Sequence, residues 1–455
     1  MLNHSPAQRR VLLIAYHFPP NASSGTFRSL KFVKYLRQFG WEPVVLSVDP
    51  RYEPCEPMDP ALLADMPDDV TVIRTQAGLP LQSRQQTTAK KPPTQPPVGD
   101  SNPGTTTTGS SGWNWFKKSV QEFVQFPDRH NGWYPFAVWA GWRAIRRYQV
   151  DALYASSPPS TGILVGLTLK LLTGKPLVSD FRDPWSKTYG KIIDQQSLSR
   201  KERWLHILET KVFAVSSYII NVSVDLTDRA RANSPPTATA KFITIYNGFD
   251  TADFAPVLHR VADEKFRIVY TGCFYDGMRE PTEFLLALQI LANQSPQEFQ
   301  AMEVWFVGDL EWIRDHSTWV AQLGLGAHAQ FKPFVPHQES LHLLAESDLL
   351  LMIGSIKKTD TGNLPAKLFE YAATRRPILA LVHEGESAKF VRSYGMGRSA
   401  NPENPQEIAN VLLQMYREIR AGTFPSEPNT EFLHQYDRRE LTRQLATVLD
   451  QSMQK

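Results

Sequence analysis

The sequence has 455 residues, of which 42% are hydrophobic and 21% are charged. At roughly 100–200 residues per domain, this length indicates two to four domains. Lys and Arg total 49 against 46 Asp and Glu, and the formal charge of +3 excludes a strongly basic nucleic-acid-binding chain. Two cysteines, Cys55 and Cys273, exclude a disulfide framework and a four-cysteine zinc site.

The longest apolar stretches, 135–142 and 349–353, fall short of the ~20 residues that span a bilayer. The N-terminal ten residues are polar, and the apolar run that follows is too short for a signal peptide. We therefore expect a cytoplasmic protein. Peripheral contact with the inner face of the membrane stays open.

The chain opens with a βαβ pattern. Residues 11–16 are a continuous apolar run, typical of a strand that is buried on both faces. A helix is predicted from Thr26, with apolar residues on one face and a stop at Gly40. A strand at 43–48 completes the unit and indicates a doubly wound sheet.

A polar segment, 83–112, interrupts this pattern. Its only apolar residues besides glycine and proline are Ala89 and Val98, so we expect a disordered insertion that cannot offset its ordering entropy by burial. The following residues, 113–126, mix aromatic side chains with Lys117 and Lys118. They are expected to form an amphipathic helix that packs on its own domain, or alternatively contacts a membrane surface.

The alternation of strands and helices resumes at 151. Strands are predicted at 151–157, 176–181, 218–223 and 242–246, with helices at 160–173 and 197–214. A second series begins with a strand at 266–272 and continues through strands at 303–308, 328–335, 348–354 and 377–382. The helices expected in it are 281–293, 314–323, 337–347, 366–374, 386–394 and 405–421.

The predicted fold is therefore α/β, with two Rossmann-like doubly wound domains that face a cleft. The predicted limits are 1–230 for the first domain, 231–425 for the second, and 426–455 for a C-terminal segment.

Several common catalytic motifs are missing from the sequence. It has no GxxxxGK[ST] loop, no GxGxxG after the first strand, and no HExxH, CxxC or GxSxG. It also lacks a DxD pair that could hold a metal on a nucleotide, so we expect no metal site. Ordinary ATPase, dehydrogenase, metalloprotease and hydrolase functions lose their usual support.

Two polar loops follow predicted strands of the first domain, where ligands of open α/β sheets bind. In the loop at 19–28, Gly25 permits close backbone approach and Arg28 offers a guanidinium to a phosphate. The segment 179–185 gathers Asp180, Arg182 and Asp183, which we predict to be catalytic. Capping of a helix in the first case, and an ion network that holds a turn in the second, are the alternatives.

Two further segments lie in the second domain. In 360–371, Asn363 is the predicted helix N-cap and Pro365 fits the first turn, so the amides of 363–366 suit a diphosphate. Glu370 on this helix can accept hydrogen bonds from a ribose diol. After the strand at 266–272, Gly272 and Arg279 form a weaker candidate for binding phosphate.

Together these segments resemble GT-B glycosyltransferases close to family 4, the glycosyl transferase group 1 set, of the bacterial surface-polysaccharide type. The resemblance covers nearly the whole chain outside 80–112. In the first half it rests on HFPP…SGTFRSLKFVKYLRQFGWEPVVLS, FPDRHNGWYPFAVWAGW and KPLVSDFRDPW. In the second half it rests on NGFDTADF, YTGCFYDGMREP and, above all, TGNLPAKLFEYAATRRPILAL.

The resemblance implies that a hexosyl group moves from a nucleotide-sugar donor to a glycan or lipid-linked acceptor, with retention and without a metal or cofactor. The second domain would hold the donor, the first the acceptor, and the C-terminal helix would cross back to the first domain. Glu370 would bind the donor ribose, and Arg182 would lie near the donor sugar. The residues expected to bind the donor are Gly25, Arg28, Gly272, Arg279, Gly362, Asn363, Leu364, Lys367 and Glu370.

The sequence departs from the family pattern at three places. Gly362 stands where many relatives have the first glutamate of an E-x7-E pair, and Cys273 replaces a basic residue. The segment 180–183 contains no histidine. Two other functions therefore stay open: a nucleotide-sugar epimerase of the same fold, and a non-catalytic scaffold.

Overall fold

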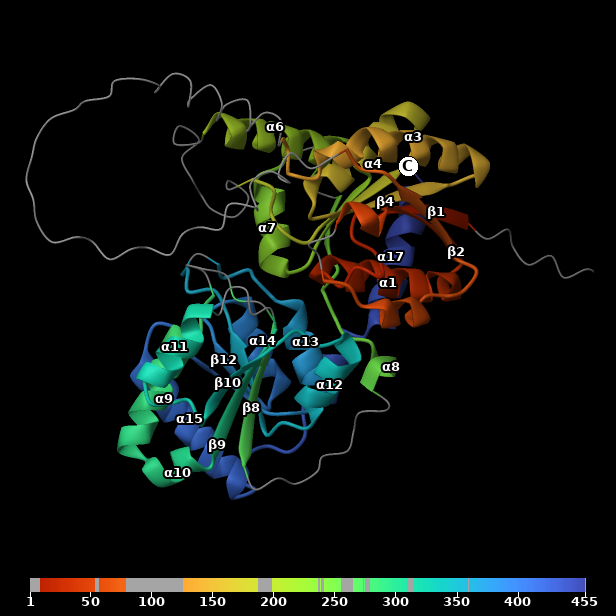
Figure 1. The fold of residues 1–455 in the computed structure, drawn as a ribbon. Helices are drawn as coiled ribbons and strands as arrows, with labels where there is room; N and C mark the ends of the chain where they lie inside the picture. Colours follow the sequence, from red (N-terminus) through yellow and green to blue (C-terminus); the bar gives the residue numbers. More distant parts are fainter. Residues whose placement is uncertain are drawn as a thin grey trace, which may run out of the picture.

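The computed structural model describes residues 9–53, 57–78, 126–186, 199–235, 238, 241–254, 265–272, 274, 279–308, 314–358 and 360–454. These residues form two parallel sheets, each with helices on both faces, in two separate lobes (Figure 1). The predicted α/β class and the doubly wound architecture are confirmed. The predicted insertion at 83–112, and all of 113–126 except Phe126, lie outside the described residues.

The first sheet has the strand order β3-β2-β1-β4-β5-β6-β7, and every pairing in it is parallel. Its strands are β1 (Arg9–Ile14), β2 (Trp41–Val48), β3 (Thr71–Thr75), β4 (Ala152–Ser157), β5 (Leu177–Phe181), β6 (Tyr218–Asn221) and β7 (Phe242–Thr244). Leu12 and Ile14 of β1 enter one apolar core, whereas Val11 and Leu13 enter another. This alternation explains the continuous apolar run, because both faces of the strand are buried.

Helices α1 (Ser24–Tyr35) and α17 (Arg438–Ser452) cover one face of this sheet. The helices α3 (Tyr134–Arg147), α4 (Ser160–Thr173) and α6 (Arg200–Val215) cover the other. Helix α7 (Val224–Ala232) lies between β6 and β7, and the short helices are η1 (Leu36–Phe39), η2 (Pro50–Tyr52), η3 (Pro60–Asp65) and η4 (Asn131–Trp133). The predicted stops at Gly40 and Gly174 are confirmed, with φ of 81° and 71°.

The second sheet has the order β10-β9-β8-β11-β12-β13. Its strands are β8 (Phe266–Thr271), β9 (Met302–Val307), β10 (Ala329–Lys332), β11 (Leu349–Ile353), β12 (Ile378–Leu381) and β13 (Gly397–Ala400). Its helices are α9 (Thr282–Gln294), α10 (Pro296–Gln300), α11 (Arg314–Gln322), α12 (His337–Ala345), α13 (Ala366–Ala373), α14 (Glu386–Tyr394) and α15 (Pro405–Arg420).

The chain crosses between the lobes twice. Strand β7 belongs to the first sheet, so the first domain extends to at least Thr244 and the predicted limit at 230 is too early. After α8 (Thr251–Phe254) the chain enters the second domain. It returns through α16 (Thr430–His434) to α17, which lies beside α1 (Figure 1). In α17, Leu441, Leu445 and Leu449 are fully buried in the first domain's core.

The sequence analysis missed several elements, among them β3, α3, α7 and β13. Strand β3 is only half-buried throughout, and β13 is partly exposed and contains glycine, so neither shows a clear apolar pattern. The residues of α3 belong to an apolar stretch and to a family motif, but no helix was predicted there. Among the described residues, no helix is long and apolar enough to cross a membrane.

Candidate donor site

The predicted donor loop, 360–365, precedes helix α13. The helix begins at Ala366, and Pro365 occupies the N-cap position without a side-chain cap. The prediction that Asn363 caps this helix is therefore wrong; its Nδ2 atom donates instead to Asp360, over 3.3 Å. Proline explains the late start, because its fixed φ and missing N–H suit an extended residue just before the first turn.

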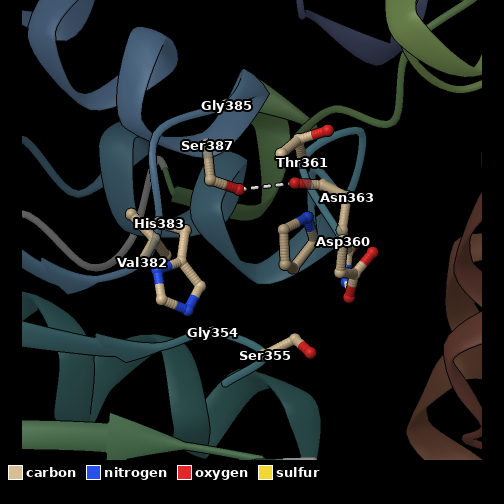
Figure 2. A pocket seen from close by; sticks show the side chains of 10 residues that line it. Gly354, Ser355, Asp360, Thr361, Asn363, Val382, His383, Gly385 and Ser387 are labelled. Atoms are coloured by element: carbon tan, nitrogen blue, oxygen red, sulfur yellow. Dashed lines mark hydrogen bonds between the residues drawn. The ribbon is translucent and has the colours of Figure 1, made fainter. Parts of the chain in front are cut away.

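The start of α14 holds this loop from within the second domain. The N–H of Glu386 donates to the carbonyl of Thr361 at 2.8 Å, and Ser387 Oγ donates to the carbonyl of Asn363 at 2.6 Å. Figure 2 shows the Ser387–Asn363 bond beside a small pocket between the ends of β11 and β12. In a trans peptide the N–H points opposite to the C=O, so these bonds also set the directions of the amides of Gly362 and Leu364.

The first domain holds the same loop from the other side. Ser223 Oγ donates to the carbonyl of Gly362 at 2.9 Å, and Arg229 donates to Thr361 Oγ1 at 2.8 Å. A Cβ atom at Gly362 would lie 2.2 Å from Asp225 Oδ2, and Asp225 is paired with Arg229 at 2.7 Å. The loop conformation therefore depends on α7, and only glycine fits at 362 beside this carboxylate.

Lys367 reaches from α13 to the end of β8. Its Nζ donates to the carbonyl of Thr271 at 2.8 Å and to Tyr270 Oη at 3.2 Å. Gly272 has φ of 127°, and a Cβ there would lie 2.3 Å from the same Nζ. The structure thus brings Gly272 and Lys367 together, as the prediction of a shared phosphate site requires.

Arg279 and Tyr371 lie behind this contact. Tyr371 Oη accepts the N–H of Thr271 at 2.9 Å, which fixes the end of β8 against α13. Burial raises the pKa of Tyr371 to about 12, and the nearby charge of Arg279 opposes that shift. Arg279 is half-buried and close enough to Tyr371 for its charge to act on the phenol, whereas Leu364 is buried in the core beneath the loop.

Glu370 lies one turn further along α13. Its Oε1 atom is 3.2 Å from His337 Nε2, and the His337 ring packs on Phe27 of the first domain with centroids 4.6 Å apart. The N–H of His337 also donates to Asp59 Oδ2 at 3.0 Å. Burial alone would raise the pKa of Glu370, but the hydrogen bond and charge of His337 lower it, which favours the ionised carboxylate.

On the side of the first domain, Arg182 lies against Gly25. A Cβ at Gly25 would be 2.6 Å from Arg182 Nη2, and this atom donates to the carbonyl of Pro158 at 2.7 Å. The Nε atom of Arg182 is buried and has no hydrogen-bond partner among the described residues. Gly25 and Arg182, which were predicted separately in two loops, therefore form one local group.

Asp183 follows Arg182 and is exposed. Partial loss of hydration raises its pKa; the charge of Arg182 opposes this shift, and that of Asp360 in the second domain adds to it. Asp183 and the donor loop thus influence each other electrostatically across the two domains.

Arg28 and Asp180 are buried inside the first domain and pair with each other. Arg28 donates to both carboxylate oxygens of Asp180, at 2.7 and 3.1 Å, and to the carbonyls of Ile245 and Tyr246. Tyr154 also donates to Asp180, and both charged side chains are almost completely inaccessible. The structure does not bring them to the donor loop, because α1 turns this face toward the sheet. Neither alternative describes these contacts: Arg28 is buried and not on the surface, and Asp180 pairs with Arg28 and not with Arg182.

The sequence analysis did not single out Ser223 or Glu209. Ser223 is the N-cap of α7, and its position after an apolar strand is a signal that could have been found. Glu209 accepts the N–H groups of Trp185 and Ser186, which holds the segment after Arg182. Burial raises the pKa of Glu209 to about 7. Nothing local in the sequence distinguishes Glu209 from other helical glutamates.

A protein-family model matches most of the first domain. Residues 29–253 match the family model described as Glycosyltransferase Family 4. A search of curated proteins finds no match.

Solved structures share the fold over the full length. HepE from Anabaena in complex with UDP-glucose is 13% identical, with a TM-score of 0.62 over 97% of this chain and 99% of that one. A glycosyltransferase from Rickettsia africae is 12% identical, with a TM-score of 0.63 and coverage of 98% and 99%. A Listeria monocytogenes protein assigned as a UDP-N-acetylglucosamine 2-epimerase is 11% identical, with a TM-score of 0.54 and coverage of 98% and 97%.

The two facing Rossmann-like domains and the family match define a glycosyltransferase of the GT-B fold. The match of residues 29–253 to the Glycosyltransferase Family 4 model confirms the predicted resemblance to family 4.

Proposed function

We propose that this chain transfers a hexosyl group from a nucleotide-diphosphate donor on the second domain to a glycan or lipid-linked acceptor on the first. The observation that carries the proposal is the contact of Lys367 Nζ with the end of β8, beside the space left by Gly272. An ammonium group, a glycine with φ of 127° and the start of α13 meet at the carboxyl end of a central strand.

This arrangement suits a diphosphate. The start of a helix carries a partial positive charge and unpaired N–H groups, so anions are favoured there. Lys367 and Arg279 add two full positive charges, and both residues are only partly exposed. We propose that these groups, without a bridging metal, stabilise the charge on the leaving nucleotide diphosphate.

Glu370 is proposed to bind the donor ribose. Its ionised form is favoured by His337, and a carboxylate oxygen can accept a hydrogen bond from a ribose hydroxyl. His337 contacts Oε1, which leaves Oε2 as the proposed acceptor. His337 and Phe27 would then fix the carboxylate from the side of the first domain.

The transfer itself is proposed to proceed with retention. The bond between the anomeric carbon and the β-phosphate oxygen breaks, and the acceptor oxygen bonds to that carbon on the same face. The acceptor proton passes to the leaving phosphate. Arg182, whose Nε atom is buried without a hydrogen-bond partner among the described residues, is proposed to contact the donor sugar or its phosphate, with Asp183 beside it.

Calorimetric titration with UDP, GDP and ADP tests the donor site. We expect one of them to bind, and Glu370→Ala to weaken that binding at least tenfold while thermal unfolding stays cooperative. Glu339→Ala, which removes an exposed glutamate on α12, is the matched control and should leave affinity unchanged. Equal affinity in wild type and Glu370→Ala would contradict the ribose assignment.

The same purified protein separates the two other functions. Conversion of a nucleotide sugar to its epimer without any acceptor would indicate an epimerase, a chemistry named for one structural neighbour. Failure of every nucleotide diphosphate to raise the unfolding temperature would indicate a scaffold, because a bound ligand stabilises the native state by mass action.

Peripheral membrane contact through 113–126 remains part of the proposal. Sedimentation of the full chain with anionic vesicles, compared with a variant in which Trp113, Trp115 and Phe116 are replaced by serine, tests it. Sedimentation of the wild type but not of the variant would support membrane contact. Equal behaviour of the two proteins would favour packing of 113–126 on its own domain.

A further inference from the structure

A second group of chemically active side chains lies in the first domain. His17 follows β1, Glu53 follows η2, and His130 precedes η4. One nitrogen of each imidazole and one oxygen of Glu53 all lie within 4.8 Å of one another. The three residues come from three separate segments, and none belongs to the donor loop or to α13.

The imidazole nitrogens of this group have unsatisfied binding capacity. Within the described part of the chain, the Nδ1 atoms of His17 and His130 are buried and have no hydrogen-bond partner. His17 Nδ1 lies 3.6 Å from Glu53 Oε1, too far for a good hydrogen bond. Buried polar atoms without partners are unfavourable and rare, so an additional bound group would satisfy them.

Neighbouring polar groups hold these side chains in position. Asn21 Nδ2 donates to Glu53 Oε2 at 3.4 Å. Asp128 accepts the backbone N–H of His130 at 2.8 Å, its Oδ1 lies 3.6 Å from His130 Nδ1, and Thr161 donates to both of its oxygens at 2.8 Å. Asp128, held by Thr161, therefore lies on the Nδ1 side of His130 and adds a second carboxylate to the group.

Aromatic rings enclose the group. Tyr16 packs edge-on against His17 with centroids 5.0 Å apart, and against Trp133 at 5.1 Å. The side chains of His17 and His130 keep exposed fractions of 13% and 17%, so solvent reaches them, whereas Glu53 is 5% exposed. A cation could therefore enter from solvent and still meet a largely dehydrated carboxylate.

A cluster of three aspartates elsewhere in the structure differs from the group around His17. Asp65, Asp250 and Asp253 also lie within reach of one cation, but Lys31 and Lys34 already fill the space between them. Their negative charge is compensated inside the protein. In the described part of the chain, no lysine lies between the side chains of the group around His17. The charge of Arg74 and the hydroxyl of Tyr16 act on Glu53, and the exposed Arg129 donates to His130 Nε2 at 3.3 Å.

We propose that His17, Glu53 and His130 bind a divalent transition-metal ion of the zinc type. Two imidazoles and one carboxylate are a known zinc ligand set, and they leave a fourth position open for water or a substrate oxygen. Imidazole ligands favour zinc, copper or nickel over magnesium or calcium. The site lies on the first domain and is separate from the proposed diphosphate site, so it does not bridge the donor phosphates.

Titration of the metal-stripped full-length chain with Co²⁺, followed by visible absorption, tests the site, with Zn²⁺ calorimetry in parallel. We expect one equivalent to bind with an intense absorption of low-coordinate Co²⁺, and Zn²⁺ to displace it. His17→Ala, His130→Ala and the nearly isosteric Glu53→Gln should each weaken binding at least tenfold. His342→Ala, which removes an exposed histidine on α12, is the control and should bind as wild type does.

Two readouts separate this inference from the proposed transfer. Zn²⁺ should raise the unfolding temperature of wild type and His342→Ala but not of Glu53→Gln, while nucleotide affinity stays equal in all three. Binding of no Co²⁺ by the folded wild type, or equal metal affinity in Glu53→Gln and wild type, would overturn the proposal. Loss of nucleotide binding alone would leave the metal site standing and contradict only the proposed function.

Discussion

The carboxylate of Asp225 in the first domain occupies the space that a side chain at Gly362 in the second would need. A Cβ at Gly362 would lie 2.2 Å from Asp225 Oδ2, so Gly362→Ala must displace either the Asp225 side chain or the donor loop. Because this loop is proposed to bind the diphosphate, we expect at least a tenfold loss of nucleotide affinity in calorimetry. The loss should come with little change in the unfolding of either domain.

Asp225→Ala provides the matched test of that contact. It removes the clashing carboxylate, so the double variant Asp225→Ala/Gly362→Ala should bind nucleotide better than Gly362→Ala alone. Coupling of this kind is expected only between residues in direct contact. An equal penalty for Gly362→Ala in both backgrounds would show that Asp225 does not set the loop conformation.

Gly272→Ala should weaken donor binding through a second contact. Its φ of 127° disfavours a side chain, and the new methyl group would lie 2.3 Å from Lys367 Nζ. We expect Lys367 to be displaced and nucleotide affinity to fall at least tenfold, with a stability cost of about 1–3 kcal/mol. Gly324→Ala is the control: its φ is 72°, nothing lies near it, and it should cost stability without affecting affinity.

Gly25 and Arg182 are predicted to act as a unit. Gly25→Ala places a methyl group 2.6 Å from Arg182 Nη2, which should push the guanidinium away. Both Gly25→Ala and Arg182→Ala should lower kcat about a hundredfold, since one preorganised donor is worth roughly 10²–10³ in rate. Nucleotide affinity should change less. Initial-rate kinetics would contradict this if the double variant showed the product of the two single losses.

The buried pair of Arg28 and Asp180 is predicted to determine stability and not donor affinity. Arg28→Ala leaves Asp180 without its main partner in the core, and breaking a buried pair costs about 3–5 kcal/mol. Denaturation should show this loss for Arg28→Ala and Asp180→Leu alike. Arg392→Ala, which breaks the exposed pair with Glu384, should have little effect. A large loss of nucleotide affinity in a fully folded Arg28→Ala variant would contradict this prediction and assign Arg28 to the donor site.

His337 should make stability depend on pH. Burial disfavours its charged form, but the hydrogen bond and charge of Glu370 outweigh this and raise its pKa above 6.5. A raised pKa means that the pair stabilises the folded state fully below pH 6.5, and that this contribution disappears as pH rises through the folded-state pKa. The unfolding temperature should therefore fall from pH 6 to pH 8.

His337→Gln should flatten that pH profile. Glu209, whose pKa burial raises to about 7, contributes a loss with the same sign, so the comparison must be between wild type and the variant. Identical slopes for both proteins would mean that the His337–Glu370 pair does not titrate in this range.

Local patterns were enough to predict most of the fold. Continuous apolar runs marked β1, β11 and β12, and glycines marked the ends of η1 and α4, because these features depend on residues close together in the chain. The same reasoning placed Arg182 and Gly272 directly after strands, where the structure has them, while Gly25 and Lys367 lie in the first turns of α1 and α13. It predicted the strand at 242–246 but placed the domain limit before it, because the sequence pattern does not show which sheet a strand joins.

The sequence by itself determined the order of the elements and which loops carry polar groups. Only the tertiary structure decided what those groups contact. Arg28 and Arg182 look alike in the sequence, yet Arg28 pairs with Asp180 in the core while the Nε atom of Arg182 is left without a hydrogen bond. The difference arises because the free energy of a charged side chain depends on burial and on partners from distant segments. For the same reason, the sequence did not predict that Asp225 lies beside Gly362, or that His17 lies beside Glu53 and His130.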